Sequence, residues 1–130
     1  MPVVDASVVV AYLAGGEARE VRERLLSSKE PLWAPQLIDA EVGHVLRRAT
    51  LAGELKPARG ASALVDLADL PLRRSGHLAL LERAWSLRRN VSFYVALYVA
   101  LAERLRMPLL TLDRRLSGSP GIRTSVEVLA

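Results

Sequence analysis

Residues 2–13 read Pro-Val-Val-Asp-Ala-Ser-Val-Val-Val-Ala-Tyr-Leu, and this stretch decides how the rest of the chain is interpreted. The apolar run at residues 2–5 predicts a short buried strand that ends on the carboxylate of Asp5. The following apolar run predicts a helix that is capped near Ser7 and stopped by Gly15 and Gly16. A strand that passes directly into a helix is the repeating unit of α/β proteins.

The same alternation continues along the whole chain. Apolar runs and helical periodicity predict the remaining elements, with strands at residues 32–34 (closed by Pro35), 70–73, 107–112 and 124–128 and helices at residues 17–26, 36–52, 57–67, 77–87 and 92–105. This order predicts an α/β fold with a mainly parallel central sheet flanked by helices. The loops are short and the chain has 130 residues, so we expect a single domain over residues 1–130.

The composition excludes several kinds of site. Apolar residues make up 51% of the chain and charged residues 25%, which is typical of a globular protein. The absence of cysteine excludes disulfides, thiolate zinc sites and cysteine nucleophiles, and two histidines are too few for a histidine-rich metal site. The net charge is +4, and 16 of the 18 basic residues are arginine. Arginine binds phosphate and carboxylate groups, so this excess permits a nucleic-acid or acidic-peptide partner, although genomic base composition explains it equally well.

The hydropathy pattern indicates neither a membrane span nor a leader. No run reaches the roughly 18 to 20 apolar residues that a membrane helix needs. Residues 1–5 carry no basic charge and reach Asp5 at once, unlike a signal peptide. We therefore expect a cytoplasmic protein without a membrane partner.

Three carboxylates stand where apolar core is expected. Asp5 follows the first strand, and Asp113 follows the strand at residues 107–112. The carboxyl ends of parallel strands lie at one edge of a sheet, but strand order decides whether these two acids are neighbours. Glu41 falls partly on the apolar face of its helix. Three acids that converge would repel one another, and a hard divalent cation such as Mg²⁺ would relieve that repulsion.

Each of these acids also has an ordinary structural explanation. Asp5 is placed to cap the first helix, and Asp113 is placed to cap the turn that follows it. Glu41 is within one or two helical turns of Arg47 and Arg48, and it can pair with either at the surface. Both interpretations of the acids stay open at this level.

Four stretches carry a resemblance to a known family. They read Val-Val-Asp-Ala-Ser at residues 3–7, Ala-Glu-Val at 40–42, Ala-Leu-Tyr-Val-Ala-Leu-Ala-Glu at 96–103 and Leu-Thr-Leu-Asp-Arg-Arg-Leu at 110–116. In this order and spacing they resemble the PIN-domain ribonucleases, specifically the VapC-type toxins of bacterial toxin–antitoxin pairs. The resemblance implies a three-layer α/β sandwich and Mg²⁺- or Mn²⁺-dependent endonucleolytic cleavage of RNA. It also implies a homodimer that a cognate antitoxin holds inactive.

The resemblance also assigns site residues. Asp5, Glu41 and Asp113 correspond to catalytic, metal-binding acids of the family. Ser7 corresponds to a supporting hydroxyl near the metal, and Thr111 is a weaker candidate for the same role.

One family acid is missing. The family pattern at the start of the penultimate helix is an aromatic residue, Asp and Ala, whereas this chain has Tyr94, Val95 and Ala96. Val95 therefore stands at a metal-ligand position without a ligand side chain. Ser92 is the predicted N-cap, and a capping box and the helix dipole would both favour a carboxylate at position 95. We expect the nuclease to be impaired or inactive.

A second class of function stays open beside the nuclease. A PIN fold without catalysis can act as a binding module for an antitoxin peptide or RNA, with Asp5, Glu41 and Asp113 accepting an arginine from the partner. A phosphoacceptor domain built on Asp5 is less well supported, because only Lys29 and Lys56 could supply the lysine of such a site.

The remaining predictions concern surfaces and core. Four arginines either follow an RNA backbone near the pocket or are ordinary exposed residues, namely Arg88, Arg89, Arg114 and Arg115. Four large side chains are expected in the core, namely Trp33, Leu78, Leu81 and Trp85. Tyr94 and Tyr98 are expected to line a groove or a dimer contact. The first helix carries more apolar residues than one face needs, and we expect some of these to face a partner, namely Val9, Val10, Tyr12 and Leu13.

Overall fold

The computed structural model describes residues 1–15, 19–27 and 29–129. Within these residues the strands are β1 (Val3–Val4), β2 (Leu32–Pro35), β3 (Leu72–Ser75), β4 (Leu109–Thr111) and β5 (Val126–Val128). The α-helices are α1 (Ala6–Ala14), α2 (Arg19–Ser27), α3 (Leu37–Leu51), α4 (Pro57–Asp69), α5 (Leu81–Ser86) and α6 (Phe93–Leu105). Two short 3₁₀ helices complete the set, η1 (Leu78–Leu80) and η2 (Arg114–Gly118).

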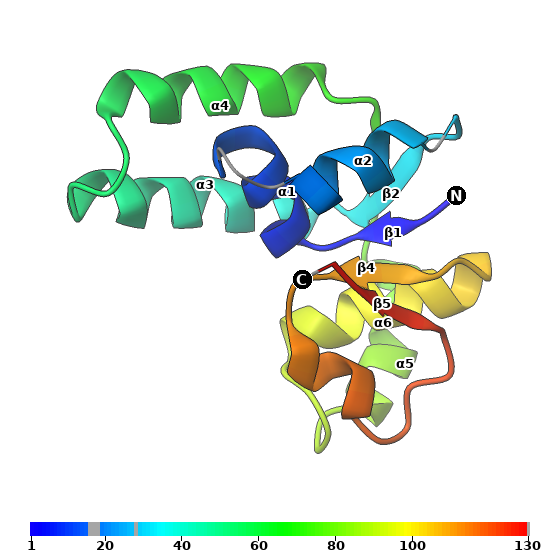
Figure 1. Ribbon diagram of the computed structural model, residues 1–130. Coiled ribbons are helices and arrows are strands. Elements are labelled where there is room, and N and C mark those ends of the chain that lie inside the picture. The colour runs from blue at the N-terminus through cyan, green and yellow to red at the C-terminus, as the bar shows by residue number, and fades with distance from the viewer. Residues whose placement is uncertain (16–18, 28, 130) are drawn as a thin grey trace.

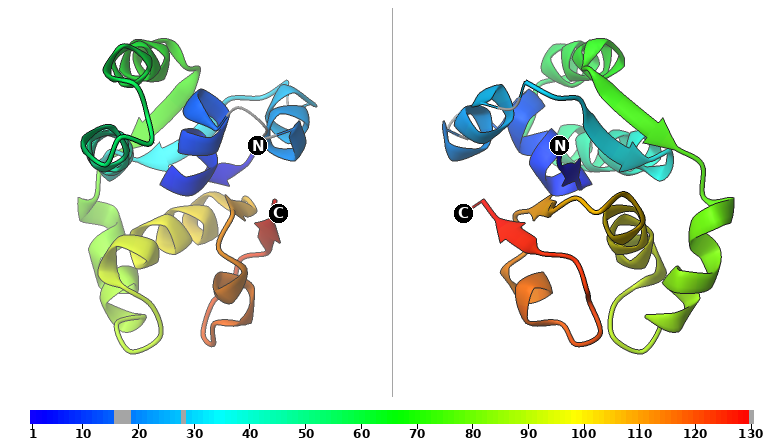
Figure 2. Two further views of the ribbon diagram at one scale, coloured as in Figure 1. Left: turned by 60° about the vertical axis from the view of Figure 1, so that its left-hand side comes forward. Right: turned by 90° about the vertical axis from the view of Figure 1, so that its right-hand side faces the viewer.

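The strands form one parallel sheet in the order β3-β2-β1-β4-β5. Val3 in β1 lies opposite Trp33 on one side and Leu109 on the other. Helices α1 to α4 lie on one side of the sheet, and α5 and α6 lie on the other (Figures 1 and 2). The prediction of an α/β sandwich around a parallel sheet is confirmed.

The core is centred on β1, β4 and α6. Val3, Val4, Leu109 and Leu110 are completely buried, because both faces of these central strands are covered by helices. Helix α6 is buried along its whole middle section, residues 96–102, where it packs on β1, β2 and β4. The first turn of α6 is therefore held firmly at the carboxyl edge of the sheet.

Several element boundaries differ by a few residues from the sequence prediction, and two of the differences have a clear local cause. The third strand was expected at residues 70–73 and begins instead at Leu72, because Pro71 has no N–H to donate to the ladder. The first helix is capped by Asp5 rather than near Ser7, since the Asp5 side chain accepts from the backbone N–H of Val8. Gly15 ends this helix as predicted, whereas Gly16 and the predicted helix start at residue 17 lie outside the described residues.

The predicted core positions around α5 are wrong. Leu78 is 87% exposed, Trp85 is 61% exposed and Leu81 is also exposed. The buried side chains of this segment are Leu80, Ala84 and Leu87. These three also have helical spacing, so the periodicity does not distinguish the two faces, and the packing of α5 on α6 decides which face is buried.

Burial limits which of the apolar α1 residues can face a partner. Val9 and Leu13 are buried in the core, so they are not among them. Val10 and Tyr12 are half-buried and pack against the core, as does Trp33 on β2. None of the helices in the described ranges is long and apolar enough to cross a membrane.

Candidate active site

A small pocket of about 120 Å³ lies where β1, α3 and α6 meet. Its polar lining comes from Asp5 and Ser7 at the start of α1, Glu41 in the second turn of α3, and Tyr98 in α6. Val95, in the first turn of α6, lines the same pocket. These residues are far apart in the sequence, and they meet because the carboxyl ends of parallel strands and the helices attached to them share one edge of the sheet.

Asp5 is held by a dense set of donors. The Ser7 hydroxyl donates to Asp5 Oδ1 at 2.5 Å, and the Val8 N–H donates to the same oxygen at 3.2 Å. The Thr111 hydroxyl donates to Asp5 Oδ2 at 2.5 Å. Burial raises the pKa of Asp5 above its ordinary value, while the hydrogen bonds from Ser7 and Thr111 act in the opposite direction. The carboxylate therefore has a fixed orientation in the pocket.

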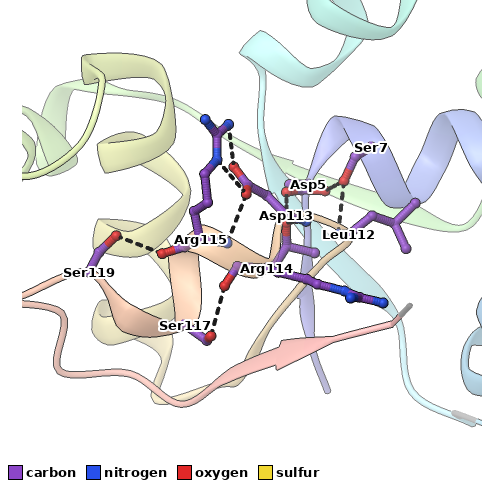
Figure 3. A network of polar contacts seen from close by, with 9 residues as sticks. Asp5, Ser7, Leu112, Asp113, Arg114, Arg115, Ser117 and Ser119 are labelled. Atoms are coloured by element: carbon purple, nitrogen blue, oxygen red, sulfur yellow. Dashed lines mark hydrogen bonds and ion pairs between the residues drawn. The ribbon is translucent and has the colours of Figure 1, made fainter.

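The same two hydroxyls connect Asp5 to the end of β4. Ser7 Oγ accepts from the N–H of Leu112 at 3.1 Å, and Thr111 Oγ1 accepts from the N–H of Asp113 at 3.0 Å. Strands β1 and β4 are neighbours, so the strand order brings these groups together. Figure 3 shows Ser7 between Asp5 and the backbone of Leu112. Thr111, which the sequence indicated only weakly, is fully buried and contacts Asp5 directly.

Glu41 has a partner that the sequence analysis did not identify. The Tyr98 hydroxyl donates to Glu41 Oε1 at 2.6 Å. Burial, together with the bond to Glu41, raises the pKa of Tyr98, so the phenol stays protonated and remains a donor. The predicted pairing of Glu41 with Arg47 or Arg48 is not what the structure shows. A signal was present in the spacing, because Tyr98 follows Val95 by three residues and so shares its face of the helix.

Asp113 does not line this pocket. Its side chain caps η2 by accepting from the N–H of Arg115 at 3.0 Å. The Arg115 guanidinium also contacts both carboxylate oxygens, at 3.1 and 3.3 Å, as Figure 3 shows. These hydrogen bonds from Arg115 lower the pKa of Asp113. The capping interpretation of Asp113 is therefore the one that the structure shows, and its link to Asp5 runs through Thr111.

Val95 lies on the wall of the pocket, at the start of α6. Ser92 caps α6 as predicted, since its hydroxyl oxygen accepts from the N–H of Val95 at 3.2 Å. A carboxylate at position 95 could return the second hydrogen bond of a capping box, and valine cannot. Its apolar side chain adds surface to the pocket without adding an oxygen.

The donor set decides which cation suits the pocket. Asp5 and Glu41 supply carboxylate oxygens and Ser7 a hydroxyl, which are the ligand types of hard cations. Within residues 1–15, 19–27 and 29–129 no group of three or more His, Cys, Asp or Glu side chains could hold a metal ion. Mg²⁺ is often held by one or two carboxylates with several waters. The residues therefore fit Mg²⁺ or Mn²⁺ in kind, with fewer acids than the three predicted.

The four arginines considered for RNA are all exposed. Arg88 lies over the ring of Trp85 at 4.9 Å, and Arg115 is engaged by Asp113. The side chain of Arg114 points away from Asp113 in Figure 3 and makes no ion pair within the described part of the chain. None of these four arginines is among the residues that line the pocket.

Comparison with known proteins agrees with this geometry. The PIN domain family model matches residues 3–119. The chain is 46% identical over 128 residues to ribonuclease VapC1 of Mycobacterium tuberculosis, covering 98% of this chain and 96% of that protein. Among solved structures, VapC20 of Mycobacterium tuberculosis, a sarcin–ricin loop cleaving toxin, superposes with a TM-score of 0.71 at 19% identity over 95% of this chain and 97% of that chain.

A toxin–antitoxin complex from Klebsiella pneumoniae superposes with a TM-score of 0.64 at 19% identity over 98% of this chain and 100% of that chain. The two solved structures show the fold. The family model and VapC1 each match nearly the whole chain, and the identity to VapC1 is much higher than the identity to either solved structure. This chain belongs to the PIN-domain family and, within it, to the VapC ribonuclease toxins.

Proposed function

We propose that this chain, as one PIN domain over residues 1–130, is a metal-dependent endoribonuclease toxin that Val95 leaves impaired. Its substrate is RNA, and its partners are a cognate antitoxin and a second copy of the chain. One observation carries the proposal, namely that Asp5, Glu41 and Val95 line one pocket. The family position that lacks its acid thus faces two acids that are present, and the VapC1 identity supports ribonuclease chemistry.

Asp5 and Glu41 are the residues that would hold Mg²⁺ or Mn²⁺. When bound, such an ion lowers the pKa of a coordinated water and offsets negative charge on the phosphate. The protein fixes the geometry, because Ser7 and Thr111 orient Asp5 and Tyr98 orients Glu41. Asp113, which follows the neighbouring strand β4 and caps η2, would have to leave Arg115 before it could join these acids.

Val95 explains the expected impairment. Replacing a carboxylate by an apolar group removes a ligand and weakens cation affinity. The remaining oxygens then position the attacking water less well. Rates fall by orders of magnitude when positioning and charge stabilisation fail together.

Restoring the acid tests the proposal. The substitution Val95→Asp should create RNA cleavage that depends on Mg²⁺ or Mn²⁺, measured on labelled RNA with and without chelator. Val65→Asp is the matched control, because Val65 is exposed on α4 and gains the same charge away from the pocket. If Val95→Asp stays inert on every RNA while the unchanged chain cuts, the assignment of position 95 is wrong.

A binding module without catalysis is the second candidate. Two observations favour it, the apolar Val95 in the pocket and the pairing of Asp113 with Arg115 outside it. In this role Asp5 and Glu41 would accept an arginine from an antitoxin peptide. Size-exclusion chromatography with a candidate antitoxin, run beside the cleavage assay, separates the two functions. A stable complex without turnover, even after Val95→Asp, favours the binding module.

A further inference from the structure

We propose that Tyr98 is a positioning residue for Glu41. Its hydroxyl holds the Glu41 carboxylate toward Asp5 and so sets the affinity of the pocket for a divalent cation. The part that concerns the cation rests on the proposed function, whereas the positioning of Glu41 does not.

The two partners differ in how firmly each is anchored. Tyr98 is only 3% exposed and lies in the buried middle section of α6. Its ring has two side-chain torsions, both restricted by packing. Glu41 is half-buried on α3 and has a longer, more flexible side chain that can turn toward water. The hydrogen bond of 2.6 Å joins residues 57 positions apart, so the anchored phenol restrains the flexible carboxylate.

Glu41 depends on this contact more than Asp5 depends on any one of its donors. Asp5 receives hydrogen bonds from Ser7, Val8 and Thr111. Within the described part of the chain Glu41 receives a side-chain hydrogen bond only from Tyr98, and only at Oε1. The other oxygen, Oε2, receives no side-chain hydrogen bond from these residues. One donor thus both directs Glu41 and leaves it able to coordinate.

The first test needs no metal. Crystal structures of Tyr98→Phe and of the control Tyr94→Phe would be compared without added cation. Tyr94 lies one turn earlier on the same helix and is 61% exposed, so it undergoes the same chemical change outside the pocket. We expect Glu41 to turn out of the pocket in Tyr98→Phe and to stay in Tyr94→Phe. If Glu41 keeps its place in Tyr98→Phe, the proposal is overturned.

The second test measures Mn²⁺ affinity by titration calorimetry in protein that carries Val95→Asp. Loss of a group that orients a metal ligand typically weakens affinity about 10- to 100-fold, and we expect a loss in this range for Tyr98→Phe and none for Tyr94→Phe. With Glu41→Gln already present, Tyr98→Phe should cause little further loss, because it acts through Glu41. An equal loss with and without Glu41→Gln would mean a general packing role and would overturn the proposal.

The two tests also separate this proposal from the proposed function. If no protein carrying Val95→Asp binds Mn²⁺, the metal-dependent function fails, and the effect of Tyr98 on cation affinity fails with it. The crystal comparison then still decides whether Tyr98 positions Glu41.

Discussion

The substitution Thr111→Val tests the hydroxyl network around Asp5. Thr111 is completely buried, its hydroxyl donates to Asp5 Oδ2 at 2.5 Å, and its oxygen accepts from the N–H of Asp113 at 3.0 Å. Valine has nearly the same shape, so the change removes both hydrogen bonds without opening a cavity. A bond to a charged group contributes about 1.5–3 kcal/mol and a neutral bond about 1 kcal/mol. Water cannot replace the buried hydroxyl, so we expect the free energy of unfolding to fall by about 2–4 kcal/mol at neutral pH.

Urea denaturation followed by circular dichroism measures this loss, and Thr124→Val is the matched control. The Thr124 hydroxyl donates to the carbonyl oxygen of Met107 at 2.7 Å, which is a neutral acceptor. Its loss should cost about 1 kcal/mol. The cost of Thr111→Val should also shrink in acid, because a protonated Asp5 no longer offers a charged acceptor. If Thr111→Val costs no more than Thr124→Val at neutral pH, the network does not stabilise an ionised Asp5.

Three further substitutions test the burial of Asp5, the cap of α6 and the core position of Leu80. Because burial raises the pKa of Asp5 above 3.8, its carboxyl stabilises the fold below that pH, and this stabilisation is lost as the pH rises through the folded-state pKa. Asp5→Asn should remove this part of the pH dependence, measured by urea unfolding across a pH series; an unchanged pH profile would contradict it. Ser92→Ala removes the cap on the N–H of Val95 and should cost about 1 kcal/mol in chemical denaturation, whereas no loss would show that the cap is unimportant. Leu80→Ala should lower the free energy of unfolding by about 2–5 kcal/mol, because Leu80 is buried. Trp85→Ala should lower it much less, because Trp85 is exposed. Comparable losses for the two variants in chemical denaturation would mean that Trp85 packs in the core.

The organisation of the site could be anticipated only in part. Asp5 and Glu41 were predicted as site residues from their surroundings and from the family resemblance, and the structure brings both into one pocket. Val95 was singled out by the resemblance, in which an Asp precedes Ala at the start of this helix, and the serine cap added only that a carboxylate at this position would complete a capping box. Tyr98 was predicted to line a groove or a dimer contact, and it lines the pocket, where it is buried and bonded to Glu41. The spacing places Tyr98 on the helix face of Val95, but nothing local to Tyr98 reports which residue of another helix will face it.

Asp113 is the site residue for which the sequence alone decided least. Its place after a buried strand predicted the correct edge of the sheet, and β4 does lie beside β1. Its side chain caps η2 and pairs with Arg115, two residues later, and it is not among the residues that line the pocket. Both capping and metal binding were consistent with the sequence, and the structure shows the cap while the metal-binding role stays a prediction.

The sequence by itself determined the alternation of strands and helices and the cap at Ser92. These features are set by interactions among residues a few positions apart, and such interactions leave periodic or local patterns. The tertiary structure alone decided the strand order β3-β2-β1-β4-β5, the contact between Tyr98 and Glu41, and the exposure of Trp85. These depend on how whole elements pack against one another, and that packing minimises the exposed apolar surface of the entire chain rather than of any one segment.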